Sequence, residues 1–561
     1  MASASAPPAE GARSSRPFNA ARVLASPVTL VTACALAGLL RLAVYAADRS
    51  LVIDEAFVAL NVARRSPTGL TGELDWNSAA PVVFLEIEKA LTALFGNSEH
   101  VLRAAPFVAS LVAIPLFVML ARRILEPRVV PLAALLFAGT ALATQYAAIV
   151  KPYAFDIMFV IGLSLATVAV LRGVGGRWVV LLLATLGIVS PLFSYASAFA
   201  VAASATVLVL DAVVQDSRAR RMRAFAVVCG WLLVLAIMFL VHRSTLSHLR
   251  HSLTRENINS LTSIRNAGGA VRQVLGVSPY SNDLGVAFAF AAAAAAAILF
   301  LVGVVRLARI AWDTALVLLL PAVFLLIASA LGWYPVLPRT MLFLAPMLVI
   351  FIAAGCSALL ESDRAILVRG SVLALLGLVL VAEAASTARA VQGVRPDDGI
   401  EPIINTLAQR ERRGDTVYLS FAAQYPFAHY LECDCAGANV ARAKRERLWP
   451  VEAAPGGVEQ WAPALRSHSN RFRIGTFRDY GLEHTLRDLA QLPRGRVWVI
   501  LAGPNAEERR TLVERLDSRG TRIWTYNNSG GVLTVSGYLY LLRGTAAARD
   551  ASSRVRLAGQ E

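Results

Sequence analysis

The chain has 561 residues, of which 56% are hydrophobic and only 16% are charged, and its mean hydropathy is +0.57. Soluble domains carry about 25% charged residues, so the composition excludes a wholly soluble protein and indicates one that crosses a membrane many times. The formal charge of +16 comes mostly from arginines that lie between apolar segments and form no single patch, which argues against nucleic-acid binding.

Residues 1–27 are small, polar and proline-containing, and we expect a disordered cytoplasmic N-terminus. The apolar segment that follows is too long for a signal-peptide core and indicates an uncleaved membrane anchor. About eleven segments are long and apolar enough to span a bilayer: 28–47, 103–121, 129–148, 153–171, 178–193, 195–213, 224–242, 284–305, 313–331, 340–358 and 366–386. Every second connector is short and arginine-rich, so the positive-inside rule places these connectors in the cytoplasm and residues after 390 outside.

An acidic pair, Asp54-Glu55, follows the first span and opens a long outer loop at 48–102. Two adjacent carboxylates at a membrane face suggest catalysis on a lipid-borne substrate, and simple solvation of a loop is the alternative. The loop pattern predicts a short amphipathic helix at 54–65 and a second helix at 81–95. Three charged residues interrupt the apolar face of this second helix, so we expect it to lie along the interface.

A second large outer loop is expected at 243–283, either as a mobile lid or as an ordinary flexible connector. From residue 391 the long apolar runs stop, and the pattern changes to strands at 415–421, 496–503 and 532–541 and helices at 403–412 and 506–519. Residues 391–545 therefore predict an extracytoplasmic α/β domain, followed by a tail at 546–561.

Two cysteines of this outer domain, Cys433 and Cys435, would be able to pair in an oxidising compartment, although a disulfide across one residue is strained. No histidine or third cysteine lies at zinc-site spacing, so the sequence predicts no metal site there.

Four local stretches carry a resemblance to a known superfamily: Ile53–Phe57; Asn77–Leu85, running on to Leu102-Arg103; Gln145-Tyr146 with Lys151–Asp156; and Trp333–Pro335 with Arg339. In this order and on one predicted side, they resemble the GT-C superfamily of polyprenyl-phosphate-sugar-dependent membrane glycosyltransferases. The nearer branch is similar to glycosyltransferase family thirty-nine, with its protein O-mannosyltransferases, lipid A aminoarabinose transferase and rhizobial galacturonosyltransferases. The similarity covers most of residues 28–390.

The resemblance implies a polytopic α-helical GT-C-like catalytic domain at 28–390 with a C-terminal extracytoplasmic α/β domain. It implies a multi-pass protein of the bacterial plasma (inner) membrane that moves a sugar from a polyprenyl-phosphate donor to an envelope lipid, glycan or protein. Inversion at the anomeric carbon is expected. No cofactor is firmly implied, and a divalent cation remains possible. The competing class is a transporter or flippase of lipid-linked sugars, which would place charges in mid-span and often shows repeats. Here mid-span charges are nearly absent apart from Arg41, near the outer end of the first span, and we find no repeat.

For the site, the resemblance assigns Asp54 as general base, with Glu55 supporting its geometry or holding the acceptor. The alternative for Glu55 is a salt bridge to Arg64, Arg65 or Lys89. Arg103 and Glu99 suggest a structural ion pair near the second span.

The donor phosphate is assigned first to Arg339 and then to Lys151 and Tyr153, because phosphate departure requires positive charge and hydrogen-bond donors. The alternative for Arg339 and Lys151 is that they are interfacial residues whose charged ends snorkel to the membrane surface. The alternative for Tyr153 and Tyr334 is that they belong to an aromatic belt at the membrane interface. Many relatives carry an acidic residue where this chain has Ile149-Val150, so Asp156 is a candidate for a second carboxylate.

Overall fold

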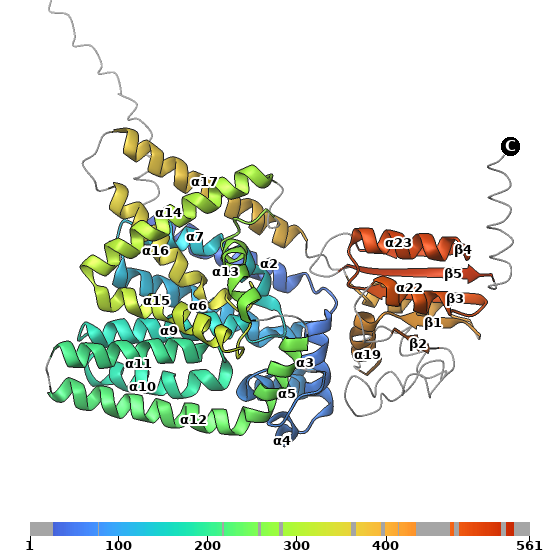
Figure 1. Ribbon diagram of the computed structural model, residues 1–561, viewed down its shortest axis with the longest axis horizontal. Helices are drawn as coiled ribbons and strands as arrows, with labels where there is room; N and C mark the ends of the chain where they lie inside the picture. Colours follow the sequence, from blue (N-terminus) through green and yellow to red (C-terminus); the bar gives the residue numbers. More distant parts are fainter. Residues whose placement is uncertain are drawn as a thin grey trace, which may run out of the picture.

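The structure is a computed structural model that describes residues 26–76, 78–215, 218–255, 260–279, 284–360, 366–393, 399–412, 414–432, 472–475, 482–528 and 534–543. A large helical domain occupies most of the described chain, and a small sheet domain lies at one end of it (Figure 1). The expected N-terminal segment up to residue 25, the tail and the cysteines 433 and 435 lie outside the described residues.

Nine helices within the described ranges are long and apolar enough to cross a bilayer. They are α2 (Pro27–Ala46), α6 (Glu99–Ile124), α9 (Tyr153–Leu171), α10 (Gly176–Phe193), α11 (Ser197–Val214), α14 (Val286–Ile310), α15 (Trp312–Ala330), α16 (Ala345–Leu360, preceded by the η2 turn Leu342–Leu344) and α17 (Ile366–Gln392). The chain is therefore a polytopic helical membrane protein, as the sequence predicts.

The expected count of about eleven spans is not confirmed. The segment predicted at 129–148 is broken into α7 (Val130–Ala138) and α8 (Ala141–Gln145, continued by the η1 turn Tyr146–Ala148), which are bent by 57°. The break lies at Gly139-Thr140, where Thr140 Oγ1 bonds back to Leu136 O and Thr387 Oγ1 binds Gly139 O. The segment predicted at 224–242 lies within α12 (Arg218–Arg255). Its apolar part, Ala224–Ile237, is shorter than the nine spanning helices.

The second outer loop expected at 243–283 is largely helical in the structure. Helix α12 continues to Arg255, and α13 follows at Ser260–Val274. The sequence of residues 243–255 contains no glycine or proline, so nothing in it stops a helix that the apolar part of α12 has already nucleated. Polar composition alone led to the expectation of a loop or lid.

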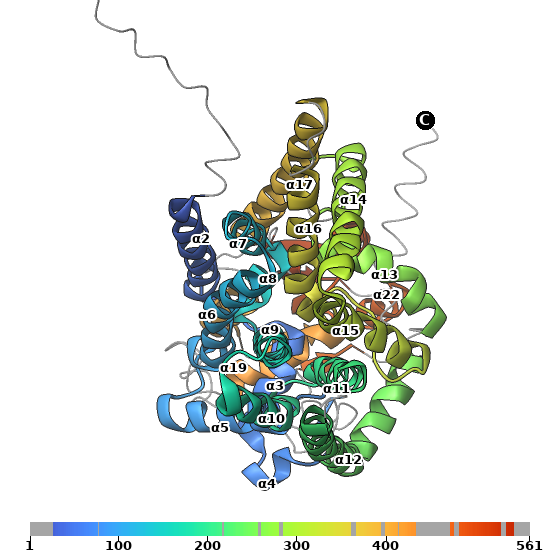
Figure 2. The same cartoon turned by 90° about the vertical axis from the view of Figure 1, so that its left-hand side faces the viewer.

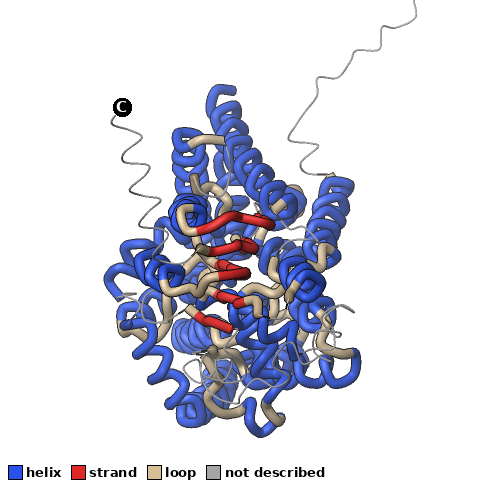
Figure 3. The backbone as a smooth tube through the Cα atoms, turned by 90° about the vertical axis from the view of Figure 1, so that its right-hand side faces the viewer, coloured by secondary structure: helices blue, strands red, loops and turns tan. Residues whose placement is uncertain are grey.

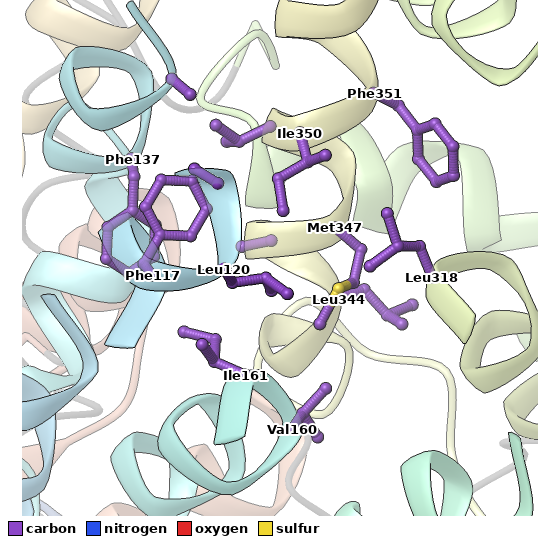
Figure 4. Close-up of a cluster of buried hydrophobic side chains, with 14 of the residues drawn as sticks. Phe117, Leu120, Phe137, Val160, Ile161, Leu318, Leu344, Met347, Ile350 and Phe351 are labelled. Carbon is purple, nitrogen blue, oxygen red and sulfur yellow. The ribbon is translucent and has the colours of Figure 1, made fainter. Parts of the chain in front are cut away.

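The membrane domain is held together by close helix packing around a common apolar core (Figure 4). Side chains of α6, α7, α9, α15 and α16 meet in this core. At the crossing of α14 and α16, a Cβ on Gly303 would lie 1.8 Å from Phe351 O, and one on Gly355 would lie 1.9 Å from Leu299 O. Only glycine permits these two backbones to come so close, which is a common device for helix association within membranes.

This crossing predicts that Gly355→Ala destabilises the protein by about 1–3 kcal/mol, because the added methyl forces the two helices apart. The matched control is Gly377→Ala in α17, where an added Cβ meets nothing within 4 Å. Thermal unfolding of both variants in detergent micelles checks the prediction, and equal melting temperatures for the two would contradict it.

The segment expected as the first outer loop contains three helices, α3 (Ile53–Arg64), α4 (Pro67–Leu70) and α5 (Val82–Phe95). Helix α3 has acidic residues in its first turn, where their negative charge interacts favourably with the positive end of the helix dipole. At its last turn, Lys89 Nζ donates a hydrogen bond to Val62 O at 2.7 Å. Helix α5 starts directly after Pro81, as expected. It differs from a simple interfacial helix because Glu88, which follows Phe84 by one turn, is fully buried, and burial raises the pKa of this carboxyl.

The C-terminal domain is a small α/β unit, in agreement with the sequence. Its elements are α18 (Glu401–Arg410), β1 (Thr416–Leu419), η3 (Phe421–Ala423), α19 (Gln424–Glu432), β2 (Phe472–Ile474), α22 (Leu482–Ala490), β3 (Gly495–Ala502), α23 (Ala506–Asp517), β4 (Gly520–Asn527) and β5 (Val535–Leu542). The strands lie side by side in one sheet (Figure 3), in the order β2-β1-β3-β5-β4. Strands β2, β1 and β3 are parallel, whereas β5 runs antiparallel to β3 and β4.

Candidate functional site

The acidic side chain of Asp54 lies at the start of α3 and faces a cation from a distant part of the chain. Arg339 belongs to the connection between α15 and η2, and its Nη1 lies 3.4 Å from Asp54 Oδ2. The two side chains are 43% and 41% exposed, respectively, so both are accessible. The fold thus joins the first candidate for the base and the first candidate for phosphate binding in one place.

Lys151 and Tyr153 lie close to this pair, at the start of α9. Lys151 is half-buried; burial lowers its pKa, while Asp54 favours its charged form and Arg339 opposes it. The ring of Tyr153 meets that of Tyr146 edge-on, with centroids 5.1 Å apart, and Tyr146 is hydrogen-bonded to Arg339. The structure therefore gathers a carboxylate, two cations and two phenols at this end of the helical domain.

Asp156 and Tyr334 lie next to this cluster. Asp156 is buried in the first turn of α9 and is hydrogen-bonded to Ser194. The ring of Tyr334 packs edge-on against Phe199 at 5.1 Å. Burial, with Asp156 and Tyr153 nearby, raises the pKa of Tyr334, so its hydroxyl keeps its proton.

Glu55 has a very different environment from its neighbour in sequence. It is fully buried, and both of its oxygens are bonded: Arg103 Nε to Oε1 and Nη2 to Oε2, both at 2.9 Å, and Arg49 Nη1 to Oε2 at 3.0 Å. The backbone N–H groups of Val52 and Val150 add bonds of 3.1 Å each. Burial alone raises the pKa of Glu55, but the two guanidinium groups and these bonds lower it to about 2.

These contacts correct the expected partners of Glu55. Its salt bridges go to Arg103 and Arg49, and Arg65 instead binds Asp75 at 2.9 Å. The other two candidates support α3 in different ways: the Arg64 guanidinium lies 5.5 Å from the Trp76 ring centroid, and Lys89 bonds the last turn of the helix.

The expected ion pair of Arg103 with Glu99 is also replaced. Arg103 binds Glu55, and Glu99 accepts a hydrogen bond from Tyr430 of the C-terminal domain. Because Glu55 has no exposed surface, its assignment as a holder of the acceptor does not fit the structure. Its role in supporting the geometry of Asp54 stays a prediction. Tyr430 was not identified from the sequence, where nothing distinguishes it from other tyrosines.

No group of three or more His, Cys, Asp and Glu side chains is placed to hold a metal ion among the residues that the structure describes. The charged side chains around Asp54 are instead cations. Such an arrangement favours an anionic ligand with oxygen atoms, such as a phosphate, over a metal ion.

The buried environment of Glu55 predicts that Glu55→Gln destabilises the protein by about 3–5 kcal/mol at neutral pH, because two buried guanidiniums lose their counter-charge. The pKa of Glu55 is about 2, below the usual value of about 4.3, so its stabilising effect is complete above that usual value and is lost as the pH falls towards the folded-state value. When the pH is lowered between these two values, the free energy of unfolding should therefore fall less for Glu55→Gln than for wild type.

Unfolding by denaturant at several pH values measures this difference. The control is Glu86→Gln on α5, a half-buried carboxylate on the same loop. Equal acid sensitivity of wild type and Glu55→Gln would contradict the assignment of Glu55 as a buried, charged group.

Residues 79–245 match the family model "Dolichyl-phosphate-mannose-protein mannosyltransferase". This match confirms the resemblance to the GT-C membrane glycosyltransferases over the segment that runs from just before α5 into α12. No curated protein sequence matches the chain.

Solved structures are similar in overall arrangement at very low sequence identity. The apo crystal structure of ArnT from Cupriavidus metallidurans has 11% identity and a TM-score of 0.46, with 91% of this chain and 97% of that chain covered. The same protein bound to undecaprenyl phosphate gives a TM-score of 0.48 at 11% identity, over 91% and 98% of the two chains. The archaeal oligosaccharyltransferase AglB from Archaeoglobus fulgidus, in complex with an inhibitory peptide and a dolichol-phosphate, gives 0.45 at 11% identity, over 91% and 74%.

Proposed function

We propose that this protein transfers a sugar from a polyprenyl-phosphate donor to an acceptor in the envelope of a bacterial cell, at the outer face of the plasma membrane. The observation that carries the proposal is the contact of Asp54 with Arg339, beside Lys151, at one end of the membrane domain. The name of the matching family model, which includes a mannose on a dolichyl phosphate, supports a lipid-phosphate donor. The acceptor is an envelope lipid, glycan or protein.

The proposed reaction is a single displacement at the anomeric carbon. An acceptor hydroxyl oxygen forms the new bond to this carbon, the bond from the carbon to the phosphate oxygen breaks, and the electron pair leaves with the lipid phosphate. Asp54 takes the proton of the hydroxyl as general base, a role typically worth about 10²–10⁴-fold in rate. Phosphate is a good leaving group, so positive charge at the departing oxygen is more important than a general acid.

The geometry suggests how donor binding and base activation are linked. Arg339 lies 3.4 Å from Asp54, too close for a sugar ring to fit between the two groups. A donor phosphate competes with Asp54 for the guanidinium, because Arg binds phosphate with two parallel hydrogen bonds. When Arg339 turns to the phosphate, the Asp54 carboxylate is released from this ion pair and can accept the proton of the acceptor hydroxyl. Lys151 and the hydroxyl of Tyr153 are the further donors that we assign to the phosphate.

The first functional prediction concerns the base. Asp54→Asn should lower transfer by at least about 100-fold, since the amide cannot accept the proton, while insertion and folding stay unchanged. Mass spectrometry of envelope lipids, glycans and glycoproteins from cells with wild-type or variant protein, at matched membrane levels, measures the product. Glu86→Gln, a charge-neutralising change on α5, is the control and should retain the product.

The outcomes of this profile separate the proposed function from the competing one. A single sugar lost from one envelope component identifies both the donor sugar and the acceptor class. Unchanged products in Asp54→Asn would reject the assigned base. A lipid-linked sugar that accumulates on the cytoplasmic side would instead support a transporter or flippase.

The second functional prediction concerns the phosphate. Arg339→Ala should reduce the rate at limiting donor by about 10- to 100-fold, as expected from a charge-assisted hydrogen bond worth about 1.5–3 kcal/mol. Arg339→Lys should recover part of this loss, because it keeps the charge and loses the two-pronged geometry. Arg309→Ala, an exposed arginine at the end of α14, is the matched control. The product identified by the envelope profile is quantified over time after expression of each variant is induced. An unchanged rate of product formation in Arg339→Ala would exclude this residue from donor binding.

A further inference from the structure

The turn that leads into α3, at residues 49–52, is held from two sides. Arg103 of α6 donates from Nη1 to the carbonyl of Arg49 at 2.7 Å, so the membrane domain fixes one side of residues 49–52. On the other side, the backbone N–H of Leu51 donates to the hydroxyl of Tyr430 at 3.0 Å. Tyr430 lies in α19 of the C-terminal domain and is only 1% exposed.

The hydroxyl of Tyr430 is fully used. It accepts the bond from Leu51 N–H and donates its proton to Glu99 Oε1 at the start of α6. Burial, together with the nearby Glu99 carboxylate, raises the pKa of this phenol, so it stays protonated and retains both roles. One atom of the C-terminal domain thus joins the turn before α3 to the first turn of α6.

A second contact from the same domain reaches the neighbouring residue of the turn. The backbone N–H of Glu401 donates to Ser50 Oγ at 3.2 Å. Gly399, which has a φ of +119°, lies against Ser50 so closely that a Cβ on it would be 2.4 Å from Ser50 Cβ. Glycine at this position allows the segment before α18 to lie on the turn.

The body of α3 also packs into the C-terminal domain. Ala56 and Leu60 of α3 belong to the same buried cluster as side chains of α18, α19 and the sheet. Phe57 meets Tyr425 edge-on, with ring centroids 4.6 Å apart. Figures 1 and 2 both place α3 beside α19, so the helix lies between the two domains.

We propose that the C-terminal domain is part of the catalytic unit and that Tyr430 is a positioning residue, whose hydroxyl fixes the turn at residues 49–52 and so holds Asp54 opposite Arg339. This inference rests on the proposed function, because it gives the domain a role in the same reaction. Tyr430 does not touch the reacting atoms. It acts through the backbone that orients the base, and a small misplacement of a catalytic group lowers a rate by up to about 100-fold.

The test compares Tyr430→Phe with Tyr540→Phe in the full-length protein. Both changes remove one hydroxyl from a buried tyrosine of the C-terminal domain and keep the ring. The Tyr540 hydroxyl donates to Asp517 at 2.8 Å, within the same domain and away from α3, which makes it a matched control. The first measurement is hydrogen exchange of peptides that cover residues 47–64. The second is the initial rate of product formation in membrane vesicles at matched protein levels, over a range of added polyprenyl-phosphate donor that carries the sugar identified by the envelope profile.

We expect Tyr430→Phe to speed exchange in this segment by about tenfold and to lower the initial rate by about tenfold, whereas Tyr540→Phe leaves both as in wild type. The rate at saturating donor should fall while half-saturation stays unchanged, because the phosphate-binding groups lie outside the segment that Tyr430 holds. Wild-type exchange in Tyr430→Phe would overturn the inference, and so would faster exchange with an unaltered rate.

Failure of the proposed function gives a distinct result. If cells with wild-type protein and cells with Asp54→Asn contain the same products, the protein does not catalyse the proposed reaction, and the inferred role of Tyr430 in that reaction is overturned with it. The exchange measurement still decides separately whether the Tyr430 hydroxyl holds the start of α3.

Discussion

The buried carboxylate of Glu55, bonded to Arg103 and Arg49, is the interaction on which the arrangement of the site depends. Its five polar contacts come from α6, from the turn before α3 and from the turn before α9. A buried ion pair is weak evidence for net stability, since desolvation offsets much of the Coulomb attraction. What it does provide is a specific geometry, because a rotation of α3 would separate three buried charges from their counter-charges. Asp54, the residue that precedes Glu55, is thereby directed away from the side of α3 on which Glu55 is buried.

Adjacent residues at the start of one helix therefore have opposite environments. Successive side chains of a helix are about 100° apart, so when Glu55 points into the protein Asp54 is presented at its surface. There its neighbours are cations and phenols from three other segments, which include the connection after α15. The membrane domain supplies this cluster, while the C-terminal domain covers the remaining face of α3 through Ala56 and Leu60. A helix packed on both sides is well suited to hold a base in a fixed orientation.

The sequence was a good guide to features that depend on local patterns. The two helices of the first outer loop, most membrane helices and the small α/β domain follow from apolar periodicity, from Pro81 and from the change of composition near residue 391. The acidic pair and Arg339 were found by their resemblance to a known superfamily, and the fold brings Asp54 and Arg339 together.

Features that depend on distant contacts could not be predicted in the same way. Glu55 and its two arginines lie on separate segments, and no local pattern indicates that Arg103 prefers Glu55 to Glu99, which lies one helical turn away. The contact of Tyr430 with the turn before α3 depends on the packing of α19 against α3, which no local sequence pattern indicates. The edge strand β4 was missed because its exposed residues form no apolar run. The break between α7 and α8 at Gly139-Thr140 was missed because the segment 129–148 is long and apolar enough overall to be one span.

The most direct test of the account is a structure of the full-length protein in a lipid nanodisc with a polyprenyl phosphate, determined by cryo-electron microscopy. The account predicts that the phosphate lies within hydrogen-bond distance of Arg339, that Arg339 has turned away from Asp54, and that the contacts of Glu55 with Arg103 and Arg49 are unchanged. A phosphate bound elsewhere, with the contact between Asp54 and Arg339 intact, would contradict it.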